Sequence, residues 1–117
     1  MFQCLKGYVD YRKPTESCEL FFWRTQADSE VDFVLYGEKA ILGIEVKNSG
    51  RVQKNDLRHL KTFCTDYAAS QGILLYRGHE ILEIDGIKCL PCEMLLKVLD
   101  PHYSPGEVVA NALGFSV

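Results

Sequence analysis

Two carboxylates and a lysine lie in apolar segments of the first half of the chain. Asp32 stands within the apolar run 31–35, and after a spacer of twelve residues Glu45 and Lys47 flank Val46 at the end of a second apolar run. A buried carboxylate without a partner is destabilising or takes up a proton, so acids inside strands need a positive partner. A divalent cation is the partner that this combination indicates.

The segment between the two runs predicts how these side chains meet. If 37–40 forms a four-residue turn, residues whose numbers sum to 77 face each other, which pairs Asp32 with Glu45 and Glu30 with Lys47. Like charges in such cross-strand pairs repel at Cβ separations of roughly 4.5 to 5.5 Å. Because alternate strand residues share a face, these four charged side chains lie together. The residues expected on the opposite, core-facing side are Val31, Phe33, Leu35, Ile44 and Val46.

These residues suit the chemistry of a hard cation. Mg²⁺ and Mn²⁺ take oxygen ligands, usually one or two carboxylates with water and substrate phosphate. Asp32 and Glu45 supply the carboxylates, and the backbone carbonyl of Val46 is a further candidate ligand. Lys47 beside such an ion would orient or help deprotonate an attacking water, or stabilise the transition state as a fixed cation. The alternative is a solvated polar face with cross-strand ion pairs, Glu30 with Lys47 among them, each contributing roughly 0.2–1 kcal/mol.

The elements expected around these residues describe one α/β domain, for which 117 residues suffice. Apolar periodicity predicts a helix over 2–11, strands at hairpin spacing over 18–25, 29–36 and 40–47, and a crossing helix over 53–67. It then predicts strands over 72–76, 79–84 and 87–90, and a helix from Pro91 to Leu99. The residue types of Asp85 and Gly86 predict a turn between the last two strands. The apolar stripe of the crossing helix is expected at Leu57, Leu60, Cys64 and Tyr67. Residues 1–99 would form the domain, a mixed sheet flanked by helices. Residues 100–117 would form a tail with at most a short helix over 107–113.

Charge and hydropathy narrow the possible partners. A net charge of -3 provides no global basic field, so contact with nucleic acid requires a local patch. Arg51, Lys54 and Arg58 form the basic cluster that could contact phosphates, with a solvated helix face as the alternative. His59 is expected to be a surface group. Without a signal-like segment or an apolar run of about 20 residues, a cytoplasmic protein without a membrane span is expected.

Two further features leave alternatives open. Trp23 and Arg24, at the end of the first strand, are either core residues or a surface for nucleic acid. The five cysteines are odd in number, which agrees with reduced thiols. Cys89 and Cys92 form a C-x-P-C motif that resembles a thioredoxin-like redox site, and that interpretation requires a low thiol pKa.

The pattern Asp32, twelve residues, then Glu45-Val46-Lys47 resembles the D…(D/E)-x-K signature of the PD-(D/E)XK nuclease superfamily. A closer resemblance is to the uncharacterised nuclease-like domain at the C-terminus of many bacterial and archaeal AAA-type ATPases. That resemblance extends over 4–99 and is carried by residues 8–11, 21–25, 29–33 and 44–47. It implies a restriction-endonuclease-like fold: a helix, a three-stranded antiparallel meander, a crossing helix and further strands. It also implies that Asp32 and Glu45 bind the metal and that Lys47 is catalytic.

Two features depart from the family pattern. Superfamily enzymes often add an acid from the first helix, which here offers only Asp10 near its end and would lack its beginning. The chain also contains no G-x-x-x-x-G-K-[ST] motif of an ATPase module. The resulting interpretation is a candidate Mg²⁺- or Mn²⁺-dependent endonuclease that acts on DNA and forms the C-terminal part of an ATPase-associated protein. The alternative is a catalytically decayed nuclease-fold module that docks a protein or ATPase partner.

Overall fold

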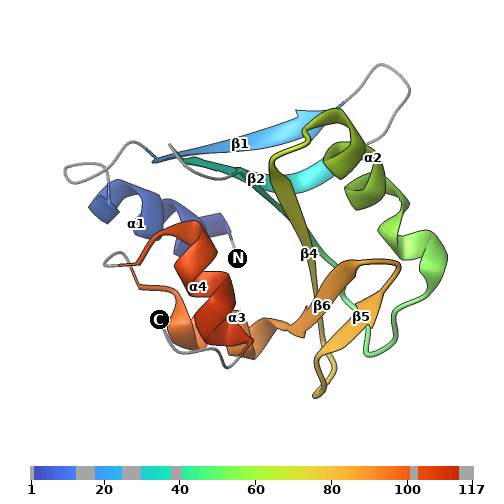
Figure 1. The fold of residues 1–117 in the computed structure, drawn as a ribbon. Helices are drawn as coiled ribbons and strands as arrows, with labels where there is room; N and C mark the ends of the chain where they lie inside the picture. The colour runs from blue at the N-terminus through green and yellow to red at the C-terminus, as the bar shows by residue number, and fades with distance from the viewer. Residues whose placement is uncertain (1, 13–17, 25–29, 38–40, 101–102, 114–117) are drawn as a thin grey trace.

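The computed structural model describes residues 2–12, 18–24, 30–37, 41–100 and 103–113, and it contains one mixed sheet with helices on both faces (Figure 1). The strands are β1 (Cys18–Arg24), β2 (Glu30–Gly37), β3 (Ile41–Val46), β4 (Ser70–Tyr76), β5 (Leu82–Ile84) and β6 (Ile87–Pro91). The helices are α1 (Phe2–Arg12), the 3-10 turn η1 (Lys54–Leu57) that leads into α2 (Arg58–Asp66), α3 (Cys92–Val98) and α4 (Pro105–Ala112).

The sheet combines antiparallel and parallel pairing in the order β1-β2-β3-β4-β6-β5. Strands β1, β2 and β3 form an antiparallel meander, β3, β4 and β6 are mutually parallel, and β5 returns antiparallel to β6. The connection from β3 to the parallel strand β4 contains α2, as a parallel crossover requires. The predicted architecture of meander, crossing helix and further strands is therefore confirmed.

The strand expected over 79–84 is shorter than the alternation suggested. The hydroxyl of Tyr76 donates to the carbonyl of Glu80 at 2.5 Å, so the chain folds back on itself before β5 begins at Leu82. The predicted turn between β5 and β6 is present, with φ of 51° at Asp85 and 82° at Gly86. Positive φ at both central residues is typical of the two-residue turns that match strand twist.

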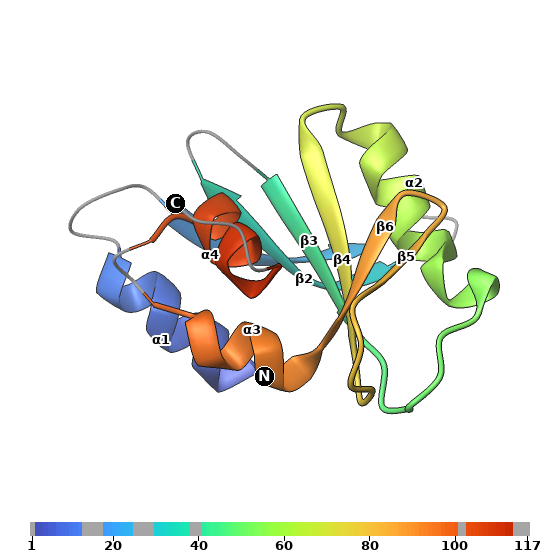
Figure 2. The same cartoon turned by 60° about the horizontal axis from the view of Figure 1, so that its bottom comes forward.

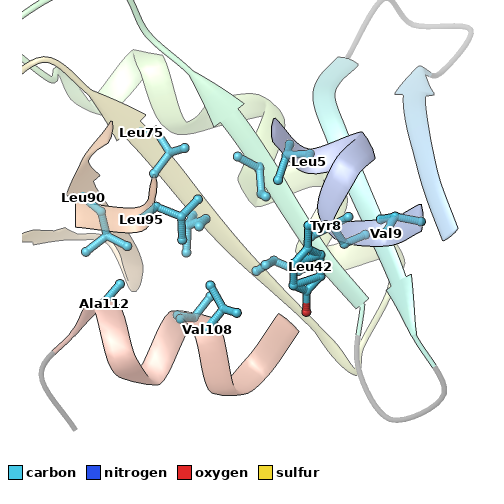
Figure 3. Close-up of a cluster of buried hydrophobic side chains, with 13 residues drawn as sticks. Leu5, Tyr8, Val9, Leu42, Leu75, Leu90, Leu95, Val108 and Ala112 are labelled. Carbon is cyan, nitrogen blue, oxygen red and sulfur yellow. The ribbon is translucent and has the colours of Figure 1, made fainter. Parts of the chain in front are cut away.

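Each face of the sheet has its own apolar cluster. Figure 2 shows the helices that cover the two faces. Helices α1, α3 and α4 cover one face, and Figure 3 shows the side chains of α1, α3, α4 and the strands meeting there. Turn η1 and helix α2 cover the other face and bury Leu57, Leu60 and Phe63 in one cluster with Val34 and Leu74. The sequence predicted one apolar and one polar face for this sheet, and that prediction needs correction. The face expected to be polar carries the second apolar cluster, under α2, and Glu45 lies at the end of that cluster.

Helix α4 gives the C-terminal segment a structural role that the sequence did not indicate. Its Val108, Val109 and Ala112 are buried in the cluster shared with α1 and α3. Ser104 caps the helix, since its Oγ accepts from the backbone N–H of Glu107 at 3.3 Å while the Glu107 carboxylate accepts from the Ser104 N–H at 3.0 Å. The described helix begins two residues before the expected range. No helix in the described part of the chain is both long and apolar enough to cross a membrane.

Candidate active site

The hairpin register that brings the two acids together is confirmed. Phe33 pairs with Ile44 and Tyr36 with Ile41, so paired numbers sum to 77 as predicted. Phe33–Ile44 is the last pair of this ladder, and the next cross-strand position holds Asp32 and Glu45. There the Oδ2 of Asp32 accepts a hydrogen bond from the backbone N–H of Val46 at 2.9 Å. The Asp32 carboxylate is thus fixed against the end of β3.

Glu45 lies on the α2 side of the sheet. Its neighbours Ile44 and Val46 belong to the cluster on the opposite face, as does Phe33 of β2, which confirms the predicted alternation of sides. The Oε1 of Glu45 lies 3.6 Å from the Nδ1 of His59 on α2, a contact that is longer than a hydrogen bond. Glu45 is therefore held between strand and helix.

His59 is not the surface group that the sequence suggested. Its side chain is only 21% exposed and that of Glu45 18%. The Nε of Arg58 donates to the Nε2 of His59 at 3.2 Å, so in the neutral imidazole Nδ1 carries the proton and directs it toward Glu45. The next residue, Leu60, is fully buried and anchors the helix close to the sheet. That packing brings the histidine to the end of β3.

Lys47 forms an ion pair with Asp56 of η1. The Oδ2 of Asp56 also accepts from the backbone N–H of Gln53 at 2.7 Å. The side chains of Lys47 and Asp56 are each less than one third exposed. The hydrogen bond from Lys47, and then that from Gln53, lowers the pKa of the Asp56 carboxyl. Sequence reasoning missed Asp56. The available signal was its position three residues after Gln53, where an acid can cap the start of a helix.

Replacing Asp56 with asparagine is expected to lower the free energy of unfolding by about 1 kcal/mol at pH 7. Because the folded-state pKa of Asp56 is below its unfolded value, its contribution is present above the unfolded pKa and is lost as pH falls through the folded pKa. Urea unfolding of both proteins from pH 7 to pH 3 measures this effect. The difference in free energy of unfolding between the wild type and Asp56→Asn should shrink toward acid pH. A difference that is constant from pH 7 to pH 3 would contradict the ion pair between Asp56 and Lys47.

The remaining predicted residues are divided among several places. Arg58 contacts His59, Lys54 has its Nζ 3.9 Å from the Oδ1 of Asp85, and Arg51 lies in the loop after β3 with its N–H donating to the Oγ of Ser49. The structure thus does not gather the three basic residues into one patch. The side chains of Glu30, Trp23 and Arg24 lie outside the described residues, so their predicted roles stay predictions.

The donor set decides which kind of metal could be held. Among the residues that the structure describes, no three His, Cys, Asp or Glu side chains converge as a metal cage would require. Asp32 and Glu45 offer two hard oxygen ligands at adjacent positions, and the carbonyl of Val46 stays a predicted third. This set fits an ion that keeps several waters, as Mg²⁺ does, and does not fit a structural zinc site.

The environment of the C-x-P-C cysteines argues against a redox site. Cys89 is fully buried in β6, and Cys92 begins α3. Burial raises the pKa of both thiols, although Arg77 partly opposes this at Cys92. A reactive thiolate needs the opposite shift, so the thioredoxin-like interpretation is not supported.

Comparisons with known proteins add a family match and a structural similarity. A family model described as "Domain of unknown function (DUF4143)" matches residues 4–95. No curated protein matches this chain. Among solved structures, the chain is similar to the small subunit (R.BspD6I2) of the heterodimeric restriction endonuclease R.BspD6I, with 12% sequence identity and a TM-score of 0.48 over 97% of this chain and 88% of that one.

Proposed function

We propose that this chain, which belongs to the DUF4143 family of domains of unknown function, is a divalent-metal-dependent nuclease. It would hydrolyse phosphodiester bonds of DNA. One observation carries the proposal. Asp32 and Glu45 occupy adjacent positions at the end of the β2–β3 ladder, and Lys47 follows Glu45 by two residues. This is the arrangement that the D…(D/E)-x-K resemblance requires.

Each side chain has a distinct role in the proposed reaction. Asp32 and Glu45 bind Mg²⁺ or Mn²⁺, with the Val46 carbonyl as a further ligand. A bound divalent cation supplies Lewis acidity toward a phosphoryl oxygen. The backbone N–H of Val46 orients the Asp32 carboxylate, and His59 holds Glu45 from the side of α2.

Lys47 supplies a fixed positive charge next to the two acids. Its ammonium donates a hydrogen bond to the attacking water or to a phosphoryl oxygen, where negative charge develops in the transition state. Asp56 restricts the ammonium to the end of β3 through their ion pair. We therefore assign Asp56 and His59 as positioning residues for Lys47 and Glu45.

A second candidate is a nuclease-fold module without activity that docks a protein, such as an AAA-type ATPase. The ion pair between Lys47 and Asp56 favours it, because this pairing neutralises the lysine without metal or substrate. In this candidate the same residues stabilise the fold, and the chain has no metal-dependent activity.

Calorimetric titration of Mg²⁺ and Mn²⁺ distinguishes the two candidates. Asp32→Asn and Glu45→Gln are each expected to weaken metal binding roughly tenfold or more, because each removes a charged ligand while keeping the shape of the side chain. Wild-type protein should then cleave plasmid DNA only when the metal is present.

The control variant is Glu83→Gln, which removes an acid on the far strand β5, where Glu83 pairs with Lys88. Its metal binding should equal that of the wild type. Titrations repeated with a saturating oligonucleotide test whether substrate phosphate is needed to complete the metal shell. Absence of metal binding in both conditions would reject the nuclease and favour the docking module.

A further inference from the structure

The carboxyl ends of the three parallel strands meet at one edge of the sheet, beside the candidate active site. Backbone pairing continues past the ends of β3 and β4, because the Lys47 N–H donates to the Leu75 carbonyl at 2.8 Å and the Arg77 N–H to the Ser49 carbonyl at 2.9 Å. The loop after β3 and the turn after β4 therefore run side by side, as Figure 2 shows. In α/β sheets, ligands bind at the carboxyl ends of the strands.

Tyr76 makes two contacts with the turn that follows β4. The buried ring of Tyr76 lies over Gly78, where an added Cβ would stand 2.1 Å from a ring carbon. The hydroxyl of the same tyrosine bonds the carbonyl of Glu80. Only glycine fits at position 78, and the turn fixes the backbone of Arg77 and His79 on either side of it.

Two pockets of about 650 and 640 Å³ flank this turn, and both are lined by residues 76–79. The first extends to Val46 and Lys47 of the candidate active site and, on α3, to Glu93. The second extends along the loop after β3 to Arg51. A group bound beside Arg77 would therefore lie next to the residues proposed to act on a phosphodiester.

Three cationic side chains lie at this edge of the sheet. The cations that line the two pockets are Lys47, Arg51 and Arg77, and the acids Glu93 and Glu80 line them as well. Lys47 is already paired with Asp56, whereas no ion pair within the described residues involves Arg51 or Arg77. A guanidinium matches the geometry of a phosphate group and can donate two parallel hydrogen bonds to it. The edge therefore presents two arginines available to an anion.

We propose that Arg77, assisted by Arg51, binds a backbone phosphate of the nucleic-acid substrate at this edge and so positions the strand for the candidate active site. This inference rests on the proposed function, because the adjacent active site is what identifies the anion as a phosphodiester. Arg77 was not recognised from the sequence, where it follows an apolar strand without other basic residues nearby.

The test measures binding without cleavage. Fluorescence anisotropy of labelled single- and double-stranded DNA is recorded in EDTA over a series of salt concentrations. Arg77→Gln is expected to weaken binding roughly tenfold and to reduce the slope of log K against log salt by about 1, as expected for loss of one phosphate contact. Lys6→Gln is the charge-matched control, since it removes a cation from α1 that lines neither pocket.

The outcomes separate this inference from the nuclease proposal. Equal affinity and equal salt slope in Arg77→Gln and Lys6→Gln would overturn the phosphate site, as would a wild-type protein that binds neither DNA. Loss of binding in Arg77→Gln without any metal-dependent cleavage by the wild type would support the phosphate site and reject the nuclease. Metal-dependent cleavage that is equal in the wild type and in Arg77→Gln would support the nuclease and reject the phosphate site.

Discussion

Lys47→Ala is expected to reduce metal-dependent DNA cleavage by about 100-fold or more while leaving metal affinity close to that of the wild type. The size follows from the usual effect of removing one group that stabilises developing charge in a transition state. Metal affinity should change little, because the proposed ligands are the oxygens of Asp32, Glu45 and Val46. Single-turnover cleavage and calorimetric titration on the same preparations measure the two effects separately.

Two further variants distinguish catalysis from simple charge balance. Lys47→Arg keeps the positive charge and the pairing with Asp56, but a guanidinium does not reproduce the compact ammonium. If Lys47 orients water or a phosphoryl oxygen, Lys47→Arg should remain impaired. Full activity in Lys47→Arg would show that any cation suffices, and full activity in Lys47→Ala would reject a catalytic role. Lys88→Ala, which removes a lysine paired with Glu83, is the control with unchanged cleavage.

Phe63→Ala is expected to lower the free energy of unfolding by about 3–5 kcal/mol, the usual cost of truncating a fully buried phenylalanine. Phe63 is 1% exposed and packs between α2 and the sheet. The ring occupies the space above Gly43, where an added Cβ would lie 2.7 Å from the ring carbon Cε1. Urea unfolding at neutral pH measures the loss, which is a large fraction of the stability of a typical domain.

The close approach of helix and strand at Gly43 allows a sharper test. Gly43→Ala alone should be destabilising by about 1–3 kcal/mol because the new methyl meets the ring. In the Phe63→Ala background the same substitution should cost much less, giving a coupling energy of about 1 kcal/mol or more. Additive effects would contradict this packing. Leu96→Ala is the control, since Leu96 of α3 is 41% exposed and its loss should be much smaller.

The interior of α2 explains why Phe63 escaped prediction. A stripe of Leu57, Leu60, Cys64 and Tyr67 assumes one regular helix, but the segment begins as a 3-10 turn and becomes α-helical only from Arg58. Within the α-helix, the positions three and four residues after Leu60 share its face, so both Phe63 and Cys64 contact this core. Tyr67 lies beyond the last helical residue, Asp66. Leu57, Leu60 and Phe63 are buried at intervals of three, while Tyr67 is exposed.

The sequence by itself determined most of the elements and, given a four-residue turn at 37–40, the β2–β3 register. Strand alternation and the spacing between apolar runs are local properties, and a four-residue turn leaves one pairing in which Asp32 and Glu45 become neighbours. Periodicity likewise predicted the meander and the crossing helix, and the residue types of Asp85 and Gly86 predicted the turn between β5 and β6.

Tertiary structure alone decided which other residues join the two acids and Lys47. His59 meets Glu45 because packing of Leu60 brings α2 against the sheet, and Asp56 meets Lys47 because η1 begins beside the end of β3. Arg77 reaches the same edge only through the parallel pairing of β3 with β4. These contacts join residues that are distant in the sequence, and their positions depend on how helices and strands pack, which periodicity does not encode.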